Sequence, residues 1–326
     1  MYEPAKLSHR ETGSLAMRPA VAEKKSYHSP MKGPHERRLA LVTGGASGLG
    51  REFCQHLAAQ GWHVVVADID LAGAQETHSA IESTGGSCQV EQLDVCDLAA
   101  WSILLEKLRA DWARLDLLIN NAGICAAGKI GDSSLSDFRR VCEVNLFGVI
   151  NGCHTMVPWM RETAPGGAIV NIASVASLLS APAMAAYSTA KAGVVSYSET
   201  LLNELHEPGI GVTVALPGFF QSQLLERGKF TDDLFRRIAQ KYTNLSTTTS
   251  SKIAQETLRA VEKGTFFVPL GWRVRMIWRV KRLAPKLFQR MVVWKCARDS
   301  LTYAETQPDL HLGPDAPEAG VPPTRG

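Results

Sequence analysis

The sequence predicts a doubly wound α/β domain with a seven-stranded parallel sheet, followed by a basic helical extension. Three observations lead to this fold class. The chain has 326 residues, 45% hydrophobic and 21% charged, which is the composition of a globular protein large enough for such a domain. From Leu39 onward, short aliphatic or β-branched runs alternate with helical stretches, as in βαβ units with a buried parallel sheet. A glycine-rich turn directly follows the first run.

Seven runs have the length and composition of buried strands. In chain order they read RLALVTG, WHVVVADID, CQVEQLDV, LDLLIN, GGAIVNIAS, GVTVALPG and TFFVP. We expect one domain over about residues 38–270, because no repeat or internal linker interrupts the alternation of these runs with helices. Residues 1–37 are polar and aperiodic, so we expect a disordered leader that lacks the apolar core of a secretory signal. Residues 301–326 are expected to be a disordered tail.

Positive charge is concentrated near the carboxyl terminus. Residues 39–271 hold 17 Lys/Arg against 23 Asp/Glu, whereas residues 272–295 hold eight Lys/Arg and no acid. This distribution argues against nucleic-acid binding by the body of the protein. In the extension predicted at 271–300, basic and apolar residues recur at helical spacing on neighbouring faces. The basic set is Arg275, Arg279, Arg282, Lys286 and Arg290, and the apolar set is Ile277, Val280, Ala284, Leu287 and Met291.

Two interpretations stay open for the basic segment 272–295. It either makes peripheral contact with an anionic membrane surface, or packs its apolar face on the protein or on a neighbouring subunit. Pro285 should kink this segment or open a second helix. Because Pro285 interrupts the apolar stripe, we favour the second interpretation.

The seven cysteines lie at positions 54, 88, 96, 125, 142, 153 and 296. Their odd number argues against a disulfide framework, and the absence of C-x-x-C or His-rich spacing argues against a zinc site. We therefore expect reduced thiols, no metal and a cytoplasmic location. No run reaches about 18 apolar residues, so we expect no transmembrane helix.

The stretch TGGASGLG, residues 43–50, follows the first run and opens a helix. Glycines there allow a tight turn, a close backbone approach to phosphate and close packing of helix on strand. The helix N-terminus offers unpaired N–H groups to a pyrophosphate. A glycine-rich loop without function is the alternative, which the strand–turn–helix context disfavours. The expected cofactor contacts are Gly44, Ser47, Gly48, Leu49 and Gly50.

Acidic and small residues follow the next three runs. Asp68 ends the second run, where a carboxylate accepts hydrogen bonds from the adenosine ribose and repels a 2′-phosphate. We expect NAD rather than NADP, since the loop holds no Lys or Arg and Arg51 lies inside the helix; Asp70 competes with Asp68 for this role. Further cofactor contacts are expected from Asp94, at the adenine edge, and Val95, and from the backbone of Asn121, Ala122 and Gly123 in NNAG.

The stretch YSTAK places Tyr187 and Lys191 four residues apart, on one helix face. Hydride transfer at a carbonyl or alcohol carbon needs a group that gives or takes a proton at the oxygen. The ordinary pKa of tyrosine, about 10, is too high for that at neutral pH, and a cation one helical turn away lowers it by favouring phenolate. The alternative is that tyrosine and lysine share a face of an amphipathic helix by chance. The surrounding motifs decide between these two interpretations.

Six motifs occur in one order: TGGASGLG, NNAG, Asn145 in VNLFG, Ser174 in VNIAS, YSTAK, and PG at 217–218. Together they resemble the short-chain dehydrogenase/reductase family, in its branch with TGxxxGxG and YxxxK, over about residues 38–270. The resemblance implies a Rossmann-type fold and hydride transfer between a nicotinamide and a carbonyl or alcohol carbon. It argues that the tyrosine–lysine pair is catalytic.

The resemblance also implies a role for each catalytic residue. Tyr187 is the general acid/base, and Ser174 hydrogen-bonds the substrate oxygen and stabilises charge there in the transition state. Asn145 holds a water that connects Lys191 to solvent, and Lys191 also binds the nicotinamide ribose. For Asn145 the alternative is a helix-interior amide that satisfies backbone groups.

Other candidates lie near these residues. Ser177 and Ser180 are rivals for the serine role. Pro217, Gly218 and Ser222 in PGFFQS are expected to contact the cofactor, although the family commonly has Thr where this chain has Ser222. Residues 219–250 are expected to form a mobile lid that determines substrate choice. Apolar residues expected to face the substrate are Ile124, Leu178, Leu179, Met184, Phe219, Phe220 and Leu224.

The sequence therefore predicts an NAD(P)-dependent oxidoreductase, with NAD favoured, that acts on a lipophilic secondary alcohol or ketone. One alternative is a catalytically silent nucleotide-binding regulatory protein, against which the intact catalytic set argues. A second alternative is an epimerase or dehydratase with the same tyrosine and lysine. By the same resemblance we expect a homodimer or homotetramer, formed through the helices near 136–161 and 187–206.

Overall fold

The computed structural model describes residues 37–306, except 208, 222–223 and 225–227. Residues 1–36 of the predicted leader and 307–326 of the predicted tail therefore lie outside the described residues, as does the predicted cofactor contact Ser222, whereas residues 301–306 are the last part of a helix.

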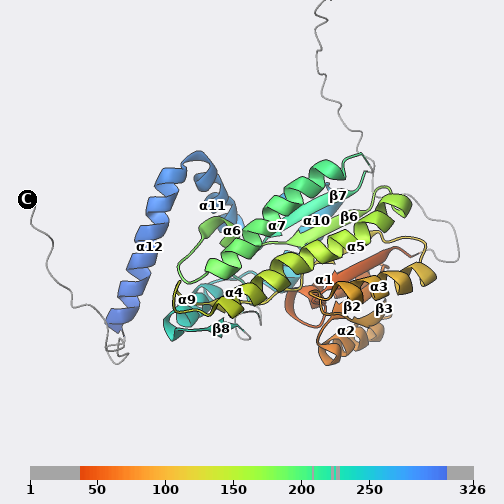
Figure 1. Ribbon diagram of the computed structural model, residues 1–326, viewed down its shortest axis with the longest axis horizontal. Coiled ribbons are helices and arrows are strands. Elements are labelled where there is room, and N and C mark those ends of the chain that lie inside the picture. Colours follow the sequence, from red (N-terminus) through yellow and green to blue (C-terminus); the bar gives the residue numbers. More distant parts are fainter. Residues whose placement is uncertain (1–36, 208, 222–223, 225–227, 307–326) are drawn as a thin grey trace, which may run out of the picture. The chain divides into compact units, whose positions relative to one another are not determined.

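The central element is a seven-stranded sheet in which every neighbouring pair is parallel, in the order β3-β2-β1-β4-β6-β7-β9 (Figure 1). Each of the seven predicted runs contributes one strand, so the predicted fold class is confirmed. The strands are β1 (Leu39–Thr43), β2 (His63–Asp68), β3 (Ser87–Gln92), β4 (Leu117–Asn120), β6 (Ala168–Ile172), β7 (Gly211–Leu216) and β9 (Phe267–Pro269).

Helices connect these strands in two groups. Helix α1 contacts both α2 and α10, whereas α3 contacts α5. Asp70 and Asp97 cap α2 and α3, because their carboxylates accept hydrogen bonds from N–H groups of the first turn. The bounds are α1 (Gly48–Ala59), α2 (Leu71–Ser83), α3 (Leu98–Asp111), α5 (Gly148–Thr163), α7 (Ala185–Glu204) and α10 (Ser250–Glu262).

The strand order reverses between β1 and β4, which lie side by side at the centre of the sheet. In an open α/β sheet, ligands bind outside the carboxyl ends of the strands at such a reversal. The glycine-rich loop follows β1 and NNAG follows β4, so both motifs lie at this point. The topology thus brings the sequence motifs to one edge of the sheet.

Several short elements were not predicted. Strands β5 (Ala126–Ala127) and β8 (Lys229–Phe230) form a separate two-stranded parallel sheet, and α4 (Leu135–Cys142) runs into a π-helical turn η1 (Glu143–Phe147). Helix α6 (Ala176–Leu179) lies between β6 and α7. The segment 219–250, expected to be a lid loop, contains β8 and helix α9 (Asp233–Asn244), so it is not a loop throughout. Two-residue strands carry no periodic pattern from which a sequence could reveal them.

The basic segment forms two helices, α11 (Trp272–Leu283) and α12 (Pro285–Thr306), with Pro285 at the start of the second. On α11, Val274 is 4% exposed and belongs to the hydrophobic core. Its methyl group lies against Gly218, where an added Cβ would be 2.9 Å from Val274 Cγ2. Arg275 pairs with Glu256 of α10 at 3.6 Å. The first part of the basic segment is therefore built into the domain.

All seven cysteines are free thiols, and Cys54, Cys125 and Cys153 are buried. Within the described part of the chain, every helix is too short or too polar to cross a lipid bilayer.

We predict that Val274→Ala lowers the free energy of unfolding by about 2 kcal/mol, because two buried methyl groups are lost and a cavity remains. Urea unfolding followed by tryptophan fluorescence measures this change. Met276→Ala is the matched control, since Met276 is on the same helix but 47% exposed. Equal effects of the two substitutions would contradict the packing of α11 on the domain.

Candidate active site

The glycine-rich loop has one tightly packed side and one open side. A Cβ on Gly50 would overlap the carbonyl oxygen of Gly44, so this glycine is needed for packing. Gly48 has a left-handed φ of +50° and nothing within 4 Å of a Cβ built on it. The side chain of Ser47 makes no capping hydrogen bond, which leaves the first N–H groups of α1 without a side-chain acceptor. The open space at Gly48 and this uncapped helix N-terminus suit a phosphate group.

Hydrogen bonds tie the loop after β4 to the end of β1. The hydroxyl of Thr43 accepts hydrogen bonds from the N–H groups of Asn121 (3.0 Å) and Ala122 (3.1 Å). In return, the amide of Asn121 donates to the carbonyls of Thr43 (3.0 Å) and Gly44 (3.3 Å). Thr43 was not among the predicted site residues, although its place directly before the first glycine was a signal for it.

Asp68 lies at the end of β2 and holds the glycine-rich loop. One carboxylate oxygen accepts from the N–H of Ala46 and the other from the N–H of Asp70, both at 2.9 Å. Its competitor Asp70 instead caps α2 by accepting from Gly73 at 3.1 Å. The contact of Asp68 with an adenosine ribose stays a prediction.

The nearest basic side chain to this loop is already engaged. Arg51 donates to the carbonyl of Ala46 at 2.6 Å and to the hydroxyl of Thr77 at 2.9 Å, and it pairs with Glu76 at 2.9 Å. It bridges α1 and α2 through its Nε and Nη2 groups.

Polar groups of the turn after β3 are hydrogen-bonded within the protein. Asp94 accepts from the N–H of Cys96 at 2.9 Å. The carbonyl of Val95 accepts from the indole of Trp101 at 3.1 Å and from the amide of Asn151 at 3.0 Å. Asp94 and Val95 lie beyond the carboxyl end of β3 as expected. The sequence did not reveal their hydrogen bonds to Cys96, Trp101 and Asn151.

The predicted catalytic residues converge around Gly123. A Cβ built on Gly123 would lie 3.1 Å from Asn145 Oδ1 and 3.7 Å from Lys191 Nζ. Lys191 Nζ in turn lies 5.9 Å from the centre of the Tyr187 ring. A side chain at position 123 would therefore need Asn145 to shift by a few tenths of an ångström.

Asn145 is fully buried in the π-helical turn η1. Its amide donates to the carbonyl of Ile124 and accepts from the N–H of the same residue, both at 2.8 Å. The side chain thus holds the backbone next to Gly123. Hydrogen bonding to backbone groups was the alternative to a catalytic role for Asn145, and the structure contains these bonds. The water relay expected at Asn145 stays a prediction.

Lys191 is a buried cation with one protein partner in the described structure. Its ammonium donates to the carbonyl of Ile172 at 2.8 Å, at the end of β6. Burial lowers the pKa of Lys191 to about 8, so the ammonium form still predominates at neutral pH.

The pKa of Tyr187 differs from the expectation. Burial raises it well above its ordinary value, the nearby thiol of Cys125 raises it further, and a hydrogen bond with the Ser174 side chain opposes the rise. The lysine was expected to lower it. Desolvation of the phenolate is the largest cause of the rise, and the ammonium of Lys191 donates its hydrogen bond to the carbonyl of Ile172.

The serine candidates are separated by their contacts. Ser174, just after β6, accepts from the N–H of Ala176 at 3.1 Å and is the serine next to Tyr187. Ser177 uses its hydroxyl to donate to the carbonyl of Ser174 at 2.7 Å. Ser180 ends α6 in a left-handed conformation with a φ of 48°. The geometry therefore favours Ser174.

A contact from α11 also reaches this region. The ammonium of Lys281 donates to the carbonyl of Leu178 in α6 at 2.7 Å, and burial lowers the pKa of this lysine. Sequence reasoning placed Lys281 in the basic extension and did not connect it to the site. On the other side of the site, the carbonyl of Pro217 accepts from the N–H of Val175 at 2.8 Å, which joins the loops after β6 and β7.

The residues expected to face the substrate fall into three settings. Ile124, Leu178 and Leu179 are partly buried and pack against the main core. Met184 and Leu224 pack against the smaller cluster that contains Cys125 and Tyr187. Phe219 is 40% exposed and stacks on Tyr242 at 5.3 Å, whereas Phe220 is partly exposed. Contact with a substrate stays a prediction for all of them.

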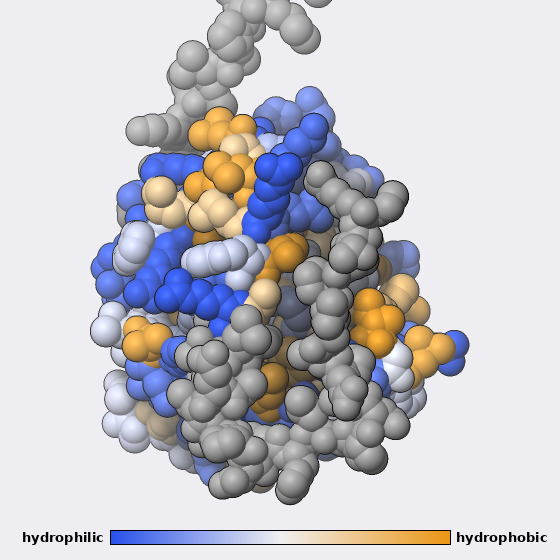
Figure 2. Space-filling view, turned by 90° about the vertical axis from the view of Figure 1, so that its left-hand side faces the viewer, coloured by the Kyte–Doolittle hydropathy of each residue, from blue (hydrophilic) through white to orange (hydrophobic). Residues whose placement is uncertain are grey.

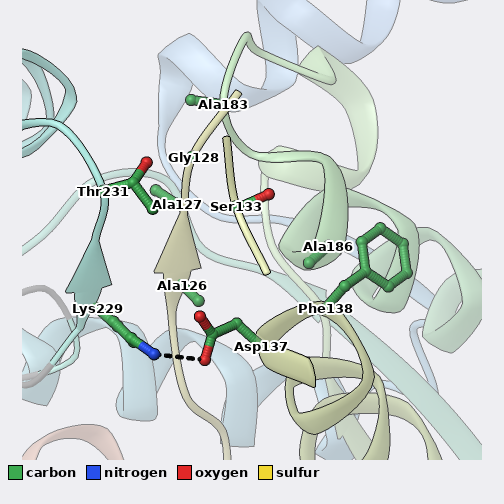
Figure 3. Close-up of a pocket in the computed structure, with 10 residues that line it drawn as sticks. All are labelled: Ala126, Ala127, Gly128, Ser133, Asp137, Phe138, Ala183, Ala186, Lys229 and Thr231. Carbon is green, nitrogen blue, oxygen red and sulfur yellow. Dashed lines mark hydrogen bonds and ion pairs between the residues drawn. The ribbon is translucent and has the colours of Figure 1, made fainter. Parts of the chain in front are cut away.

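A small pocket lies beside the two-stranded sheet (Figure 3). Its walls come from β5, β8, α4 and the start of α7, where Ala186 precedes Tyr187. Small residues such as Gly128 and Ala183 line one side, and the ion pair of Asp137 with Lys229, 2.9 Å long, lies at another. This pocket adjoins the tyrosine helix without containing any predicted catalytic residue.

Comparisons with known proteins agree with this geometry. The sequence profile described as short chain dehydrogenase matches residues 38–231. The chain is 33% identical to the protein named "Probable oxidoreductase EphD" of Mycobacterium bovis and Mycobacterium tuberculosis, over 76% of this chain but 43% of that protein, so it spans less than half the length of that relative. It is 32% identical to 3beta-hydroxysteroid dehydrogenase 1 of Eggerthella lenta, over 63% of this chain and 78% of that protein. A crystal structure of a short chain dehydrogenase/reductase from Burkholderia phymatum in complex with NAD aligns with a TM-score of 0.73 at 27% identity, covering 77% of this chain and 95% of that one.

We predict that Gly48→Ala and Gly50→Ala separate binding from folding. Gly50→Ala overlaps the backbone and should lower the free energy of unfolding by about 1–3 kcal/mol. Gly48→Ala adds only the strain of a left-handed alanine, about 1 kcal/mol, but fills the open space and should weaken dinucleotide binding at least tenfold. Urea unfolding and fluorescence titration measure the two effects. Wild-type affinity in Gly48→Ala would contradict this assignment.

We predict that Lys191→Met raises the melting temperature at pH 7 by about 3 °C or more. The buried lysine has a folded pKa of about 8 against an ordinary 10.5, so the unfolded chain binds more protons between these values. The lysine therefore destabilises the fold fully below pH 8, and this effect fades as the pH rises. The difference in melting temperature should accordingly narrow from pH 8 to pH 10.5.

Calorimetry across this pH range is the measurement. Lys263→Met is the control, because Lys263 is exposed and its replacement should leave the melting temperature nearly unchanged at every pH. A Lys191→Met protein that melts below the wild type at pH 7 would show that the bond to Ile172 outweighs the desolvation of the ammonium.

Proposed function

We propose, since this chain belongs to the short chain dehydrogenase family, that it is an NAD-dependent oxidoreductase acting on a lipophilic secondary alcohol or ketone. The observation that carries the proposal is the convergence around Gly123. Asn145 Oδ1 and Lys191 Nζ approach this glycine from different elements, and the Tyr187 ring lies 5.9 Å from Lys191 Nζ. A nucleotide loop and a buried proton-transfer pair thus share one edge of the sheet.

The residues present fit a dinucleotide. The open side of the loop at Gly48 would hold the pyrophosphate together with the N-terminus of α1, while Gly44 and Gly50 allow the close packing behind it; Asp68 would accept from the adenosine ribose hydroxyls. The backbone after Asn121 would follow the cofactor toward the catalytic residues. When bound, the nicotinamide supplies or accepts the hydride at the substrate carbon.

The chain's own residues handle the proton at the substrate oxygen. In the direction of carbonyl reduction, the hydroxyl of Tyr187 donates its proton to the oxygen, and the raised pKa keeps that proton in place at neutral pH until charge develops. The hydroxyl of Ser174 donates a hydrogen bond to the same oxygen and stabilises its charge. The ammonium of Lys191 stabilises the phenolate that remains. Asn145 positions the backbone of Ile124 beside them.

Two observations support NAD over NADP. The carboxylate of Asp68 would lie beside a 2′-phosphate and repel it. Arg51, which donates to the loop carbonyl of Ala46, also holds Thr77 and Glu76 through its Nε and Nη2 groups. A relative solved in complex with NAD is consistent with this choice.

The substrate class is proposed from the apolar residues near Tyr187. Leu178, Leu179 and Met184 lie between Ser174 and the tyrosine in the sequence, and Phe219 follows β7. A relative named for a hydroxysteroid supports a lipophilic alcohol or ketone. The complete set Asn145, Ser174, Tyr187 and Lys191 argues against a silent regulatory protein, and an epimerase or dehydratase would show no net change in NADH.

We predict that the protein binds NADH more tightly than NADPH, and that Asp68→Ala removes this preference. The variant should weaken NADH binding about tenfold or more, because charge-assisted hydrogen bonds to the ribose are lost. Intrinsic fluorescence titration measures both affinities. Asp70→Ala is the matched control, since Asp70 caps α2, and it should leave the preference unchanged. Tighter binding of NADPH by the wild type would overturn the role of Asp68.

We predict that Tyr187→Phe lowers kcat at least 100-fold for a lipophilic secondary alcohol while NADH affinity stays within about twofold. Oxidation of steroid and long-chain secondary alcohols, followed as NADH absorbance, is the assay. The nearby Tyr197→Phe on the same helix is the control and should retain activity. Turnover confined to small polyols or hydroxy acids would contradict the substrate class, and full activity of Tyr187→Phe would contradict the mechanism.

A further inference from the structure

We propose that the outer surface of α11 and α12 docks on an anionic lipid bilayer. This surface, here called the basic-apolar surface, consists of large apolar side chains left exposed among lysines and arginines. Its apolar members are Trp272, Leu283, Leu287, Met291, Val293 and Trp294, which are 51–84% exposed. Figure 2, which looks at the side where α12 lies in Figure 1, shows apolar side chains next to strongly hydrophilic ones.

Over residues 285–298, the part of α12 whose side chains are described, the helix has two apolar faces, and one of them packs within the domain. Phe288, Val292 and Cys296 recur every four residues and are the less exposed set, with Phe288 at 9%. Leu287, Met291 and Trp294 recur at spacings of four and three on another face and are exposed. An outward stripe of this size is unfavourable in water unless something covers it.

The charges around the stripe favour an anionic surface as the partner that covers it. Residues 272–295 contain eight Lys/Arg and no acid, whereas residues 39–271 carry six more acids than bases. Lys286 and Arg290 directly precede Leu287 and Met291 in the sequence and are exposed, so cations flank the stripe. A bilayer with anionic headgroups offers negative charge at its surface and apolar chains beneath, which matches both features at once.

Two exposed tryptophans of this surface, Trp272 on α11 and Trp294 on α12, are each paired with an arginine. The guanidinium of Arg273 lies 5.5 Å from the Trp272 ring, and that of Arg298 lies 5.3 Å from the Trp294 ring. A tryptophan with a cation beside it is suited to the headgroup region, where one end of the side chain is in an apolar medium and the other in water. Because none of the described helices can span a bilayer, the contact is peripheral.

The inner side of α11 connects this surface to the active site. Val274 lies against Gly218, and Lys281 holds the carbonyl of Leu178. Docking would therefore bring the loops after β6 and β7 close to the bilayer, from which a lipophilic substrate could enter. This last step rests on the proposed function, whereas the docking itself does not.

The test is co-sedimentation of the full-length protein with vesicles, without substrate or cofactor. One set contains phosphatidylcholine alone, and the other contains phosphatidylcholine mixed with phosphatidylglycerol. We expect binding to the anionic vesicles only, reduced by high salt. Lys286→Gln/Arg290→Gln should weaken this binding about 30-fold, and Leu287→Ser/Met291→Ser at least tenfold.

Matched double variants of the body serve as controls. Lys252→Gln/Lys263→Gln removes two exposed lysines, and Ile103→Ser/Ile130→Ser removes two exposed isoleucines, outside the surface. Both should bind like the wild type, and circular dichroism confirms that every variant is folded. Equal binding to both kinds of vesicle, or wild-type binding by the surface variants, overturns the proposal.

A second measurement distinguishes the other occupant. If the surface joined two copies of this chain, Leu287→Ser/Met291→Ser would change the mass measured by analytical ultracentrifugation without lipid, and this outcome would also overturn the proposal. Because vesicle binding is measured without turnover, the proposed dehydrogenase activity can fail while docking is observed, and the reverse also holds.

Discussion

The hydroxyl of Thr43 forms the link on which the site depends. It accepts from Asn121 and Ala122, and so joins the ends of β1 and β4 where the strand order reverses. Two residues after Ala122, both backbone groups of Ile124 are hydrogen-bonded by the side chain of Asn145. The short loop between them is therefore held at both ends, by Thr43 on one side and by Asn145 on the other.

The sequence predicted the seven strands and the residues that meet at their carboxyl ends, because hydrophobic runs and glycine spacing are local signals. It did not predict β5 and β8, which exist only through pairing between segments about 100 residues apart. Nor did it reveal that Lys281 reaches Leu178, since only the packing of α11 brings these residues together. The predicted lowering of the Tyr187 pKa was wrong, because the spacing of Tyr187 and Lys191 indicates a neighbouring charge but not how far the phenol is removed from water. The oligomeric state and the roles of the site residues stay predictions.

Burial disfavours the charged forms of both Tyr187 and Lys191, the proposed catalytic pair. It raises the pKa of Tyr187 and lowers that of Lys191, so both side chains are driven toward their neutral forms. The bond from Lys191 to the carbonyl of Ile172 compensates part of this effect by giving the ammonium a fixed dipole in place of water. The fold thus keeps a destabilising cation at the point where charge is useful to the proposed reaction.

The buried thiols give the protein a built-in chemical reporter. Burial raises the pKa of Cys125 to about 11 and that of Cys153 to about 12, and it raises the pKa of Cys54 as well. Because the thiolate is the form that alkylating reagents attack, these groups are nearly inert while the helices cover them. The rate at which each buried thiol is alkylated therefore measures how often the native core opens at that cysteine. Cys54 reports on the separation of α1 from the sheet, and Cys153 on that of α5.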